Sequence, residues 1–264
     1  KGTTLGADNG IGVALALSVL QDKTLRHGPL EALITYDEET GMTGANSLKA
    51  GILKGDILLN LDSEEEGELC TGCAGGVDGA ADFAYRTYKT PEGFVGYKIT
   101  VKGLKGGHSG MDISLFRGNA NKIICRLLEA VISEYDVKVA SITGGSLRNA
   151  IPFEAEAEIL VPSADSRKVK ALVEKKFEES KFEYQYSDPD MILIYEKQSA
   201  PAARYISPKV IGKAVKAILA CPHGVQRMSD TLPGLTETST NMAIVRTQKG
   251  HLTVHSLTRS SIDA

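Results

Sequence analysis

Two strand-like apolar runs near the start of the chain each end in a cluster of carboxylates. The runs are Leu33–Tyr36 and Ile57–Leu61, and the acidic clusters are Asp37–Gly41 and Leu61–Glu64. In an open α/β sheet, the carboxyl ends of the strands form the ligand crevice. Like-charged carboxylates crowded there repel one another unless protons or metal ions lie between them. The pattern therefore predicts an α/β layer that carries a hydrolytic metal centre.

Four carboxylates are candidates for that centre. Asp8, Glu39 and Asp62 offer oxygen ligands, and Glu38 is a spare carboxylate beside them. Three of them have an alternative interpretation, because Asp8 also suits an N-cap and Glu38 and Glu39 also suit a solvated rim. For the remaining acidic residues of this region we expect only a solvated rim, namely Glu64, Glu65, Glu66 and Glu68.

The residues around these carboxylates predict a fragment of a βαβ layer. Apolar side chains recur at helical spacing over residues 10–25, and a short helix is expected over 44–50. The strands expected over 32–36 and 56–61 are apolar without alternation, which is typical of parallel strands covered on both faces.

The pattern changes after Gly75 and Gly76, and a second region of α+β class begins. Mixed strands and amphipathic helices predict a mostly antiparallel sheet with helices on one face. We place the boundary near Gly75–Gly79, which gives domains 1–77 and 78–264. The expected strands are 95–101, 137–142, 150–160, 191–195, 243–247 and 252–257, the helices 119–134, 166–179 and 208–220, and the loops 75–92 and 183–190.

Composition excludes several classes of partner. The 30 Lys and Arg against 33 Asp and Glu give a net charge of -3, which argues against nucleic acid. No apolar run reaches the roughly 18 residues of a membrane span.

Four cysteines are too few for a disulfide scaffold, so we expect a reducing cytoplasm. Cys70 and Cys73 form a CxxC pair that also suits redox or zinc chemistry, although we expect ordinary buried thiols.

Six ordered motifs together resemble one enzyme family. They are Thr4–Gly12, Glu38–Gly41, Asn60–Glu65, Gly106–Gly110, Leu147–Pro152 and Glu237–Asn241. The chain resembles the dinuclear-zinc exopeptidases related to aminoacylase and carnosinase, and within them the bacterial aminoacyl-histidine dipeptidases. The resemblance runs from Gly2 to Asp263. It implies a partial catalytic α/β layer followed by an α+β lid and dimerisation domain.

The resemblance also implies a role for each matching residue. Asp8 would bridge two zinc ions, Glu39 would bind one and Asp62 the other, with cobalt or manganese as substitutes. Glu38 would be the general base that takes a proton from the metal-bound water. In the lid, His108 would stabilise the oxyanion, with a loop histidine shaped by glycines as its alternative. Substrate binding would fall to Asn149, Asn241 and Arg259, whose guanidinium suits a substrate carboxylate.

The implied activity is hydrolysis of dipeptides, including Xaa-His, by a cytoplasmic enzyme that is a homodimer through its lid. The family also needs metal-binding histidines before Asp8 and near its C-terminus, which these 264 residues do not supply. We therefore expect a piece of the enzyme that is inactive alone. The other histidines are expected to be structural or exposed, namely His27, His223, His251 and His255. The alternatives are a non-catalytic lid or dimerisation module and an amidohydrolase acting on N-acyl amino acids.

Overall fold

The computed structural model describes residues 9–62, 67, 69 and 72–263, apart from the side chains of Glu39 and Thr40. The chain divides into two compact units, Lys1–Gly72 and Cys73–Ala264, which we call the first and the second unit. Gly75 and Gly79, where we expected the chain to change domain, lie within one strand of the second unit.

The described residues of the first unit form three helices. The helix α1 (Gly10–Gln21) begins at Asn9, whose side-chain Oδ1 accepts a hydrogen bond from the N–H of Gly12 at 2.8 Å. This bond satisfies one of the free donors of the first turn. The helix ends four residues before the predicted end. Two single turns follow, α2 (Glu38–Gly41) and α3 (Thr43–Asn46), and α3 is shorter than the helix predicted over 44–50.

The two strands predicted in the first unit are wrong for this structure. Residues 32–36 and 56–61 take no strand conformation, and none of the described ladders includes them. Ile57, Leu58 and Leu59 are 82%, 77% and 77% exposed. A parallel strand needs neighbours for its hydrogen bonds and elements over both faces, and the described residues of this unit provide neither.

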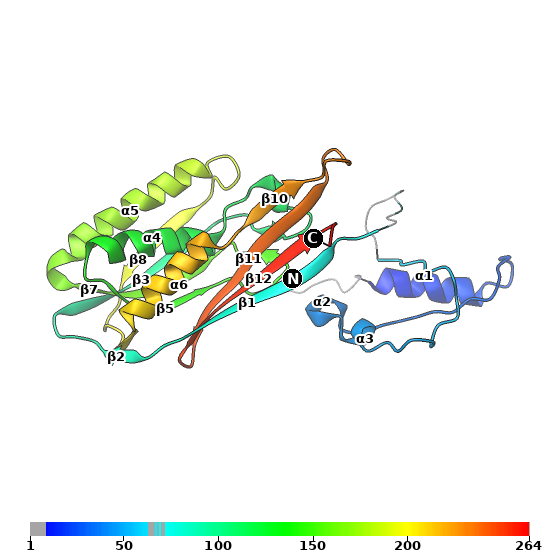
Figure 1. Ribbon diagram of the computed structural model, residues 1–264, viewed down its shortest axis with the longest axis horizontal. Coiled ribbons are helices and arrows are strands. Elements are labelled where there is room, and N and C mark those ends of the chain that lie inside the picture. Colours follow the sequence, from blue (N-terminus) through cyan, green and yellow to red (C-terminus); the bar gives the residue numbers. More distant parts are fainter. Residues whose placement is uncertain (1–8, 63–66, 68, 70–71, 264) are drawn as a thin grey trace. The chain divides into compact units, whose positions relative to one another are not determined.

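The second unit is built on an eight-stranded antiparallel sheet (Figure 1). Its strands are β1 (Gly75–Ala84), β3 (Phe94–Lys102), β5 (Lys138–Gly144), β7 (Ala155–Pro162), β8 (Ile192–Lys197), β10 (Gly224–Met228), β11 (Thr236–Gln248) and β12 (His251–Ser260). The order is β1-β12-β11-β5-β7-β3-β8, and β10 pairs with β11. Two smaller sheets pair β2 (Thr87–Lys89) with β9 (Arg204–Ile206) and β4 (Gly107–His108) with β6 (Ala150–Ile151).

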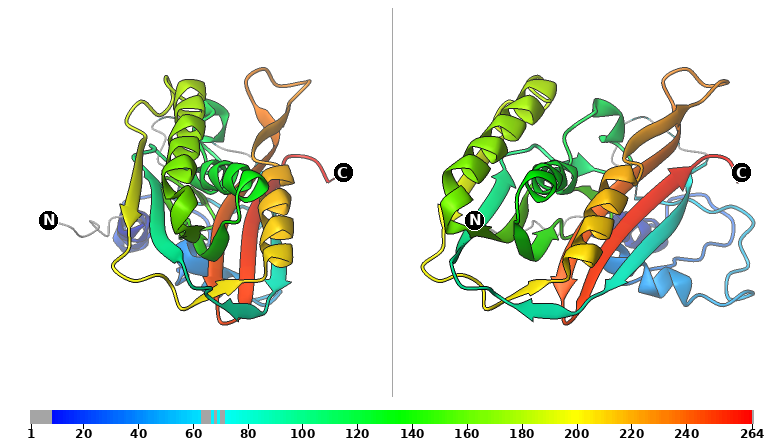
Figure 2. Two further views of the ribbon diagram at one scale, coloured as in Figure 1. Left: turned by 90° about the vertical axis from the view of Figure 1, so that its left-hand side faces the viewer. Right: turned by 60° about the vertical axis from the view of Figure 1, so that its left-hand side comes forward.

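Three helices cover one face of this sheet (Figure 2). They are α4 (Ala120–Glu134), α5 (Ser166–Glu183) and α6 (Pro208–Ala220), and α4 packs against both of the others. Two 3-10 turns, η1 (Ile113–Leu115) and η2 (Ser163–Asp165), complete the unit. The core forms where apolar side chains of these helices meet the sheet, including Ile99, Ile123, Leu127, Val173 and Ile211. The predicted class, with helices on one face of an antiparallel sheet, is confirmed.

Several strands of the second unit differ from the prediction. The expected loop 75–92 contains β1 and β2, and β10 was not predicted. The sequence of β1 is rich in glycine and alanine, and Val77 is its one β-branched residue, so it has few of the residues typical of strands. Pairing with β12 along its whole length holds it in the sheet. The single strand expected over 150–160 is instead divided into β6 and β7.

Strand register places polar side chains on the opposite, helix-free face. Along β12, Leu252 and Val254 belong to the core, so the alternating Thr253 and His255 point away from the helices. A β-bulge between Met242 and Ile244 shifts the register of β11. Because of this extra residue, positions on β11 that differ by an odd number can share a face.

Candidate functional site

In the first unit, the residue that follows Asp8 contacts Asp62. The Nδ2 of Asn9 donates hydrogen bonds to the carbonyl of Leu61 at 2.8 Å and to Asp62 Oδ1 at 3.2 Å. Asn9 is also the N-cap of α1, so one side chain connects the start of the helix to Leu61 and Asp62. Asp8 itself lies outside the described residues, as do Glu64, Glu65, Glu66 and Glu68.

Glu38 follows a residue in an uncommon backbone conformation. Asp37 has φ 61° and Met42 has φ 55°, so left-handed residues flank the turn that carries Glu38 at its start. Such conformations cost energy in residues other than glycine and occur often at functional sites. The hydroxyl of Thr43 donates a hydrogen bond to the Asp37 carboxylate, which helps to hold the turn.

The described side chains supply only part of a metal-ligand set. Among them, no group of three or more His, Cys, Asp or Glu residues is arranged to hold a metal ion. Asp62 uses Oδ1 for Asn9, and its Oδ2 has no partner among the described residues. A carboxylate oxygen is a suitable ligand for a catalytic zinc ion. The ligands predicted at Asp8 and Glu39 lie outside the described side chains.

In the second unit, Gly107 shapes the loop that presents His108. Gly107 has φ 133° and makes the short β4–β6 ladder with Ile151. A Cβ on Gly107 would lie 2.3 Å from Arg117 Nη1 and 2.4 Å from Asp112 Oδ2. Only glycine fits this position, because both the conformation and the space exclude a side chain.

Hydrogen bonds select one tautomer of the His108 ring. Its Nδ1 is 3.3 Å from the backbone N of Gly110 and 3.2 Å from that of Met111, and both N–H groups point at it. Nδ1 therefore accepts, and the neutral ring carries its proton on Nε2. Burial lowers the pKa of His108, and the charge of Arg259 lowers it further, although Asp112 opposes them. The side chain is thus a neutral N–H donor at Nε2.

The predicted substrate-binding residues lie around this loop. The N–H of Ser109 donates to the carbonyl of Asn149 at 2.7 Å. Asn241 is 1% exposed, and its Nδ2 donates to the carbonyls of Arg148 and Ala150 at 3.0 and 2.8 Å. This amide therefore holds the segment on either side of Asn149.

Three buried polar atoms near His108 have no hydrogen-bond partner among the described residues. They are Ser109 Oγ, Asn241 Oδ1 and Arg259 Nε. A Cβ on Gly110 would lie 3.2 Å from His108 Cε1 and 3.5 Å from Arg259 Nε, so these two side chains flank Gly110. Buried polar groups without partners are costly and uncommon, so each calls for an explanation such as a bound ligand or water. The structure brings His108, Asn149, Asn241 and Arg259 into one neighbourhood.

Sequence reasoning missed the residues that support the His108 loop. Asp112 accepts from the His108 N–H at 2.8 Å, and Arg117 Nη1 donates to the Gly106 carbonyl at 2.6 Å. The fully buried Asp188 accepts from the N–H groups of Lys105 and Gly118, which bracket the loop. Asp112 could have been found from its spacing four residues after His108. Asp188 lies 70 residues after Gly118 in the sequence, and no residue pattern near it indicates this role.

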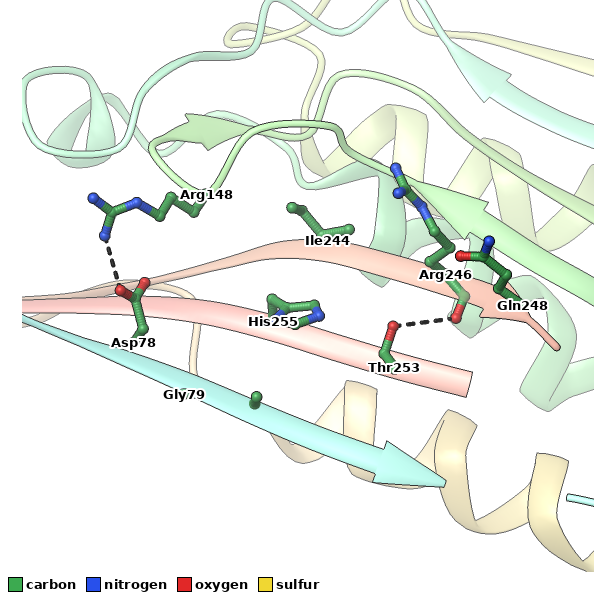
Figure 3. A pocket seen from close by; sticks show the side chains of 9 residues that line it. Asp78, Gly79, Arg148, Ile244, Arg246, Gln248, Thr253 and His255 are labelled. Carbon is green, nitrogen blue, oxygen red and sulfur yellow. Dashed lines mark hydrogen bonds and ion pairs between the residues drawn. The ribbon is translucent and has the colours of Figure 1, made fainter. Parts of the chain in front are cut away.

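A shallow cavity of about 430 Å³ lies on the helix-free face (Figure 3). Arg148 forms an ion pair with Asp78 at one end, at 2.8 Å, and Arg246 stands at the other. His255, which was predicted to be structural or exposed, lies between them and is exposed at the cavity. The lining residues are Asp78, Gly79, Ala80, Arg148, Ile244, Arg246, Gln248, Thr253 and His255.

The other histidines have structural contacts. His223 Nδ1 lies 3.2 Å from Asn119 Nδ2 and 3.4 Å from the backbone N of Met242. His251 pairs with Asp82 at 2.8 Å, and the ring of the exposed His27 contacts the carbonyl of Gly28.

The cysteines divide by exposure. Cys125 is fully buried, and burial raises its pKa to about 12, whereas Cys221 is half-buried. Cys73 is exposed, so the expectation of buried thiols is wrong there. The reason is that Cys73 precedes β1, outside the core. Cys70 lies outside the described residues.

Comparison with known proteins identifies relatives along the whole chain. Residues 92–185 match a family model described as the M20 peptidase dimerisation domain. The chain is 44% identical to the cytosol non-specific dipeptidase of Escherichia coli, over all of this chain and 54% of that protein. It is 27% identical to the uncharacterized protein YqjE of Bacillus subtilis, over 84% of this chain and 62% of that protein.

A solved structure also matches the chain along its whole length. The crystal structure of the aminoacylhistidine dipeptidase from Vibrio alginolyticus matches with a TM-score of 0.79 and 48% identity, over all of this chain and 54% of that one. The chain therefore spans about half the length of the Escherichia coli and Vibrio alginolyticus relatives. In the part of the chain that the structure describes, no helix is long and apolar enough to cross a membrane.

Proposed function

Because this chain belongs to the M20 family of peptidases, we propose that the whole protein is a metal-dependent dipeptidase. The names of its relatives support this activity, since both a cytosol non-specific dipeptidase and an aminoacylhistidine dipeptidase match the chain along its full length. The proposal includes a cytoplasmic location, for which the name of the Escherichia coli relative is the support.

The metal site that we propose uses Asp8, Glu39 and Asp62 with ligands from the rest of the protein. Two zinc ions bound there would lower the pKa of a water molecule and polarise the scissile carbonyl. Asp62 supports this assignment, because Asn9 holds it beside the start of α1 and leaves Oδ2 for a cation. Glu38 is proposed as the general base, at the start of a turn fixed by left-handed residues on both sides.

His108 is proposed as the donor that stabilises the oxyanion formed during hydrolysis. The observation that carries this role is the pair of backbone N–H groups on Nδ1, which leaves Nε2 as the donor. A lowered pKa keeps the ring neutral, so its tautomer remains defined near neutral pH. Preorganised donors of this kind stabilise charge where it develops in the transition state.

We propose that Arg259 binds the carboxylate of the dipeptide and that Asn149 and Asn241 help to orient it. The buried Nε of Arg259, which has no partner within the described part of the chain, supports this role, because a guanidinium pairs well with a carboxylate. Substrates of the Xaa-His type are included in the proposal, with the name of the Vibrio alginolyticus relative as support.

A homodimer through the second unit is also proposed, because residues 92–185 match a dimerisation domain. The strand β5 lies within this segment, and one of its edges is already occupied, because Val245 and Arg246 of β11 in the same chain pair with it. The strands at the two ends of the described sheet are β1 and β8. Sedimentation of the full-length protein checks the dimer, and Ile192→Lys on β8 checks that edge, because a charged side chain discourages edge pairing.

The experiment that tests the catalytic proposal is a substrate panel on the full-length protein with its metal content measured. We expect turnover of dipeptides, including Xaa-His, and little turnover of N-acyl amino acids. Glu38→Gln is expected to retain metal and lose about 10²–10⁴-fold in kcat, whereas Asp62→Ala is expected to lose metal. Turnover of N-acyl amino acids alone would support an amidohydrolase. The absence of any hydrolysis would support a non-catalytic module.

A further inference from the structure

Asp112 and His108 are joined by a closed pair of hydrogen bonds. The Asp112 carboxylate Oδ2 accepts from the backbone N–H of His108 at 2.8 Å, and the Asp112 N–H donates to the His108 carbonyl at 2.9 Å. These reciprocal bonds fix the five-residue turn from His108 to Asp112. The N–H groups of Gly110 and Met111, which point at Nδ1, belong to the same turn.

Arg117 connects this turn to Gly106, the residue before β4. Its Nη2 lies 3.4 Å from Asp112 Oδ1, and its Nη1 donates to the carbonyl of Gly106 at 2.6 Å. Both ionised side chains are partly buried. Gly107 packs against the pair so closely that an added Cβ would collide with both. The carboxylate is thus held from two directions while it holds the turn.

We propose that Asp112 is a positioning residue that, with Arg117, keeps the His108 ring oriented with Nε2–H as its free donor. This inference rests on the proposed role of His108. Asp112 does not contact the Nε2 edge of the ring; it acts by keeping the N–H groups of Gly110 and Met111 on Nδ1. Without it, the turn and the ring can move, and misplacement of a catalytic group by about 1 Å can cost 10²-fold in rate.

A double-mutant cycle in the full-length enzyme separates positioning from general structural support. The variants are Asp112→Ala, His108→Ala and the double variant, assayed on a dipeptide that the wild type hydrolyses. We expect Asp112→Ala to lower kcat by about 10- to 100-fold, with KM and metal content nearly unchanged. In the His108→Ala background, the same change is expected to lower kcat no further, because residues in one network are not additive.

Two further variants keep the test falsifiable if Asp112→Ala is poorly folded. Asp112→Asn retains an acceptor for the His108 N–H and loses the charge that attracts Arg117, so it is expected to recover most of kcat. Glu183→Gln breaks the exposed ion pair with Arg126 in the same unit, at 2.5 Å, and is the matched control with unchanged kcat. Thermal unfolding of every variant is measured beside the kinetics.

The outcomes distinguish this inference from the function on which it rests. An equal loss of kcat from Asp112→Ala in both backgrounds, or no loss in the wild-type background, would overturn the positioning role. Near-normal kcat in His108→Ala alone would instead refute the proposed role of His108 and the inference together. A large loss in His108→Ala with a normal Asp112→Ala would refute only the inference.

Discussion

The carboxylate of Asp188 accepts a hydrogen bond from the backbone N–H of Gly118 at 2.7 Å, although the two residues are 70 positions apart. The same buried carboxylate accepts from the Lys105 N–H at 2.8 Å and from the Ser187 hydroxyl at 2.8 Å. Lys105 and Gly118 lie on either side of His108, so Asp188 ties the two ends of its loop together. Three donors are therefore directed at one buried carboxylate.

We predict that Asp188→Asn destabilises the second unit by about 1–3 kcal/mol, because the new NH₂ group would face a backbone donor and leave it unsatisfied. Urea unfolding of the full-length protein measures the loss. Hydrogen exchange at the Lys105 and Gly118 amides locates it. Asp190→Asn is the control, since Asp190 is exposed two residues further along. Equal stability of the two variants would contradict this account of Asp188.

His223 should make the stability of the second unit depend on pH. Burial, and next the charge of Lys122, lower the pKa of His223 from 6.5 to about 4. The unfolded chain then binds the proton more tightly than the folded chain. Stability is therefore complete above about pH 6.5 and is lost as the pH falls from there towards 4. A pKa difference of this size corresponds to about 3 kcal/mol.

The measurement for His223 is the free energy of unfolding between pH 7 and pH 4. We expect His223→Gln to remove most of the pH dependence assigned to this ring, with a lower stability at pH 7. His27→Gln is the matched control, because His27 is exposed. If the wild type and His223→Gln lose stability in parallel as the pH falls, His223 does not carry the effect.

Gly212 offers a stabilising substitution in α6. It lies inside the helix, and a Cβ there would meet nothing within 4 Å. Gly212→Ala is expected to raise the free energy of unfolding by about 0.5–1 kcal/mol, because glycine loses more backbone entropy on folding. Gly107→Ala provides the contrast, since its Cβ would collide with Arg117 and Asp112. A lower free energy of unfolding for Gly212→Ala would contradict this prediction and would show that something other than the space around the Cβ constrains α6 at this position.

The helices of the second unit could be predicted because their signals are local. The Asn119 side chain caps α4 by accepting a hydrogen bond from the Lys122 N–H, and Pro208 begins α6. The start of each helix can therefore be predicted from residues close to it in the sequence. The strand β1 could not be predicted, because its glycines and alanines become a strand only through pairing with β12. The two apolar runs of the first unit show the converse, since β propensity without partners gives no strand.

The candidate site also combines features that the local sequence predicts with features that depend on long-range contacts. The glycine-rich motif identified His108 from the sequence, but the tautomer of its ring depends on the turn that Asp112 closes. The proximity of Arg259 and Asn241 to this loop depends on the register of β11 and β12, which is shifted by a bulge. The contact between Asn9 and Asp62 joins segments more than 50 residues apart. Such long-range contacts form only on folding, so residue types alone do not predict them.

The most direct test of the central claim is kcat of His108→Ala in the full-length enzyme, with metal content determined on the same sample. The account predicts a loss of about 10²–10³-fold in kcat, as for the removal of one oxyanion donor, with the metal retained. Near-normal kcat with the metal retained would contradict it and would leave His108 as a loop residue shaped by its glycines.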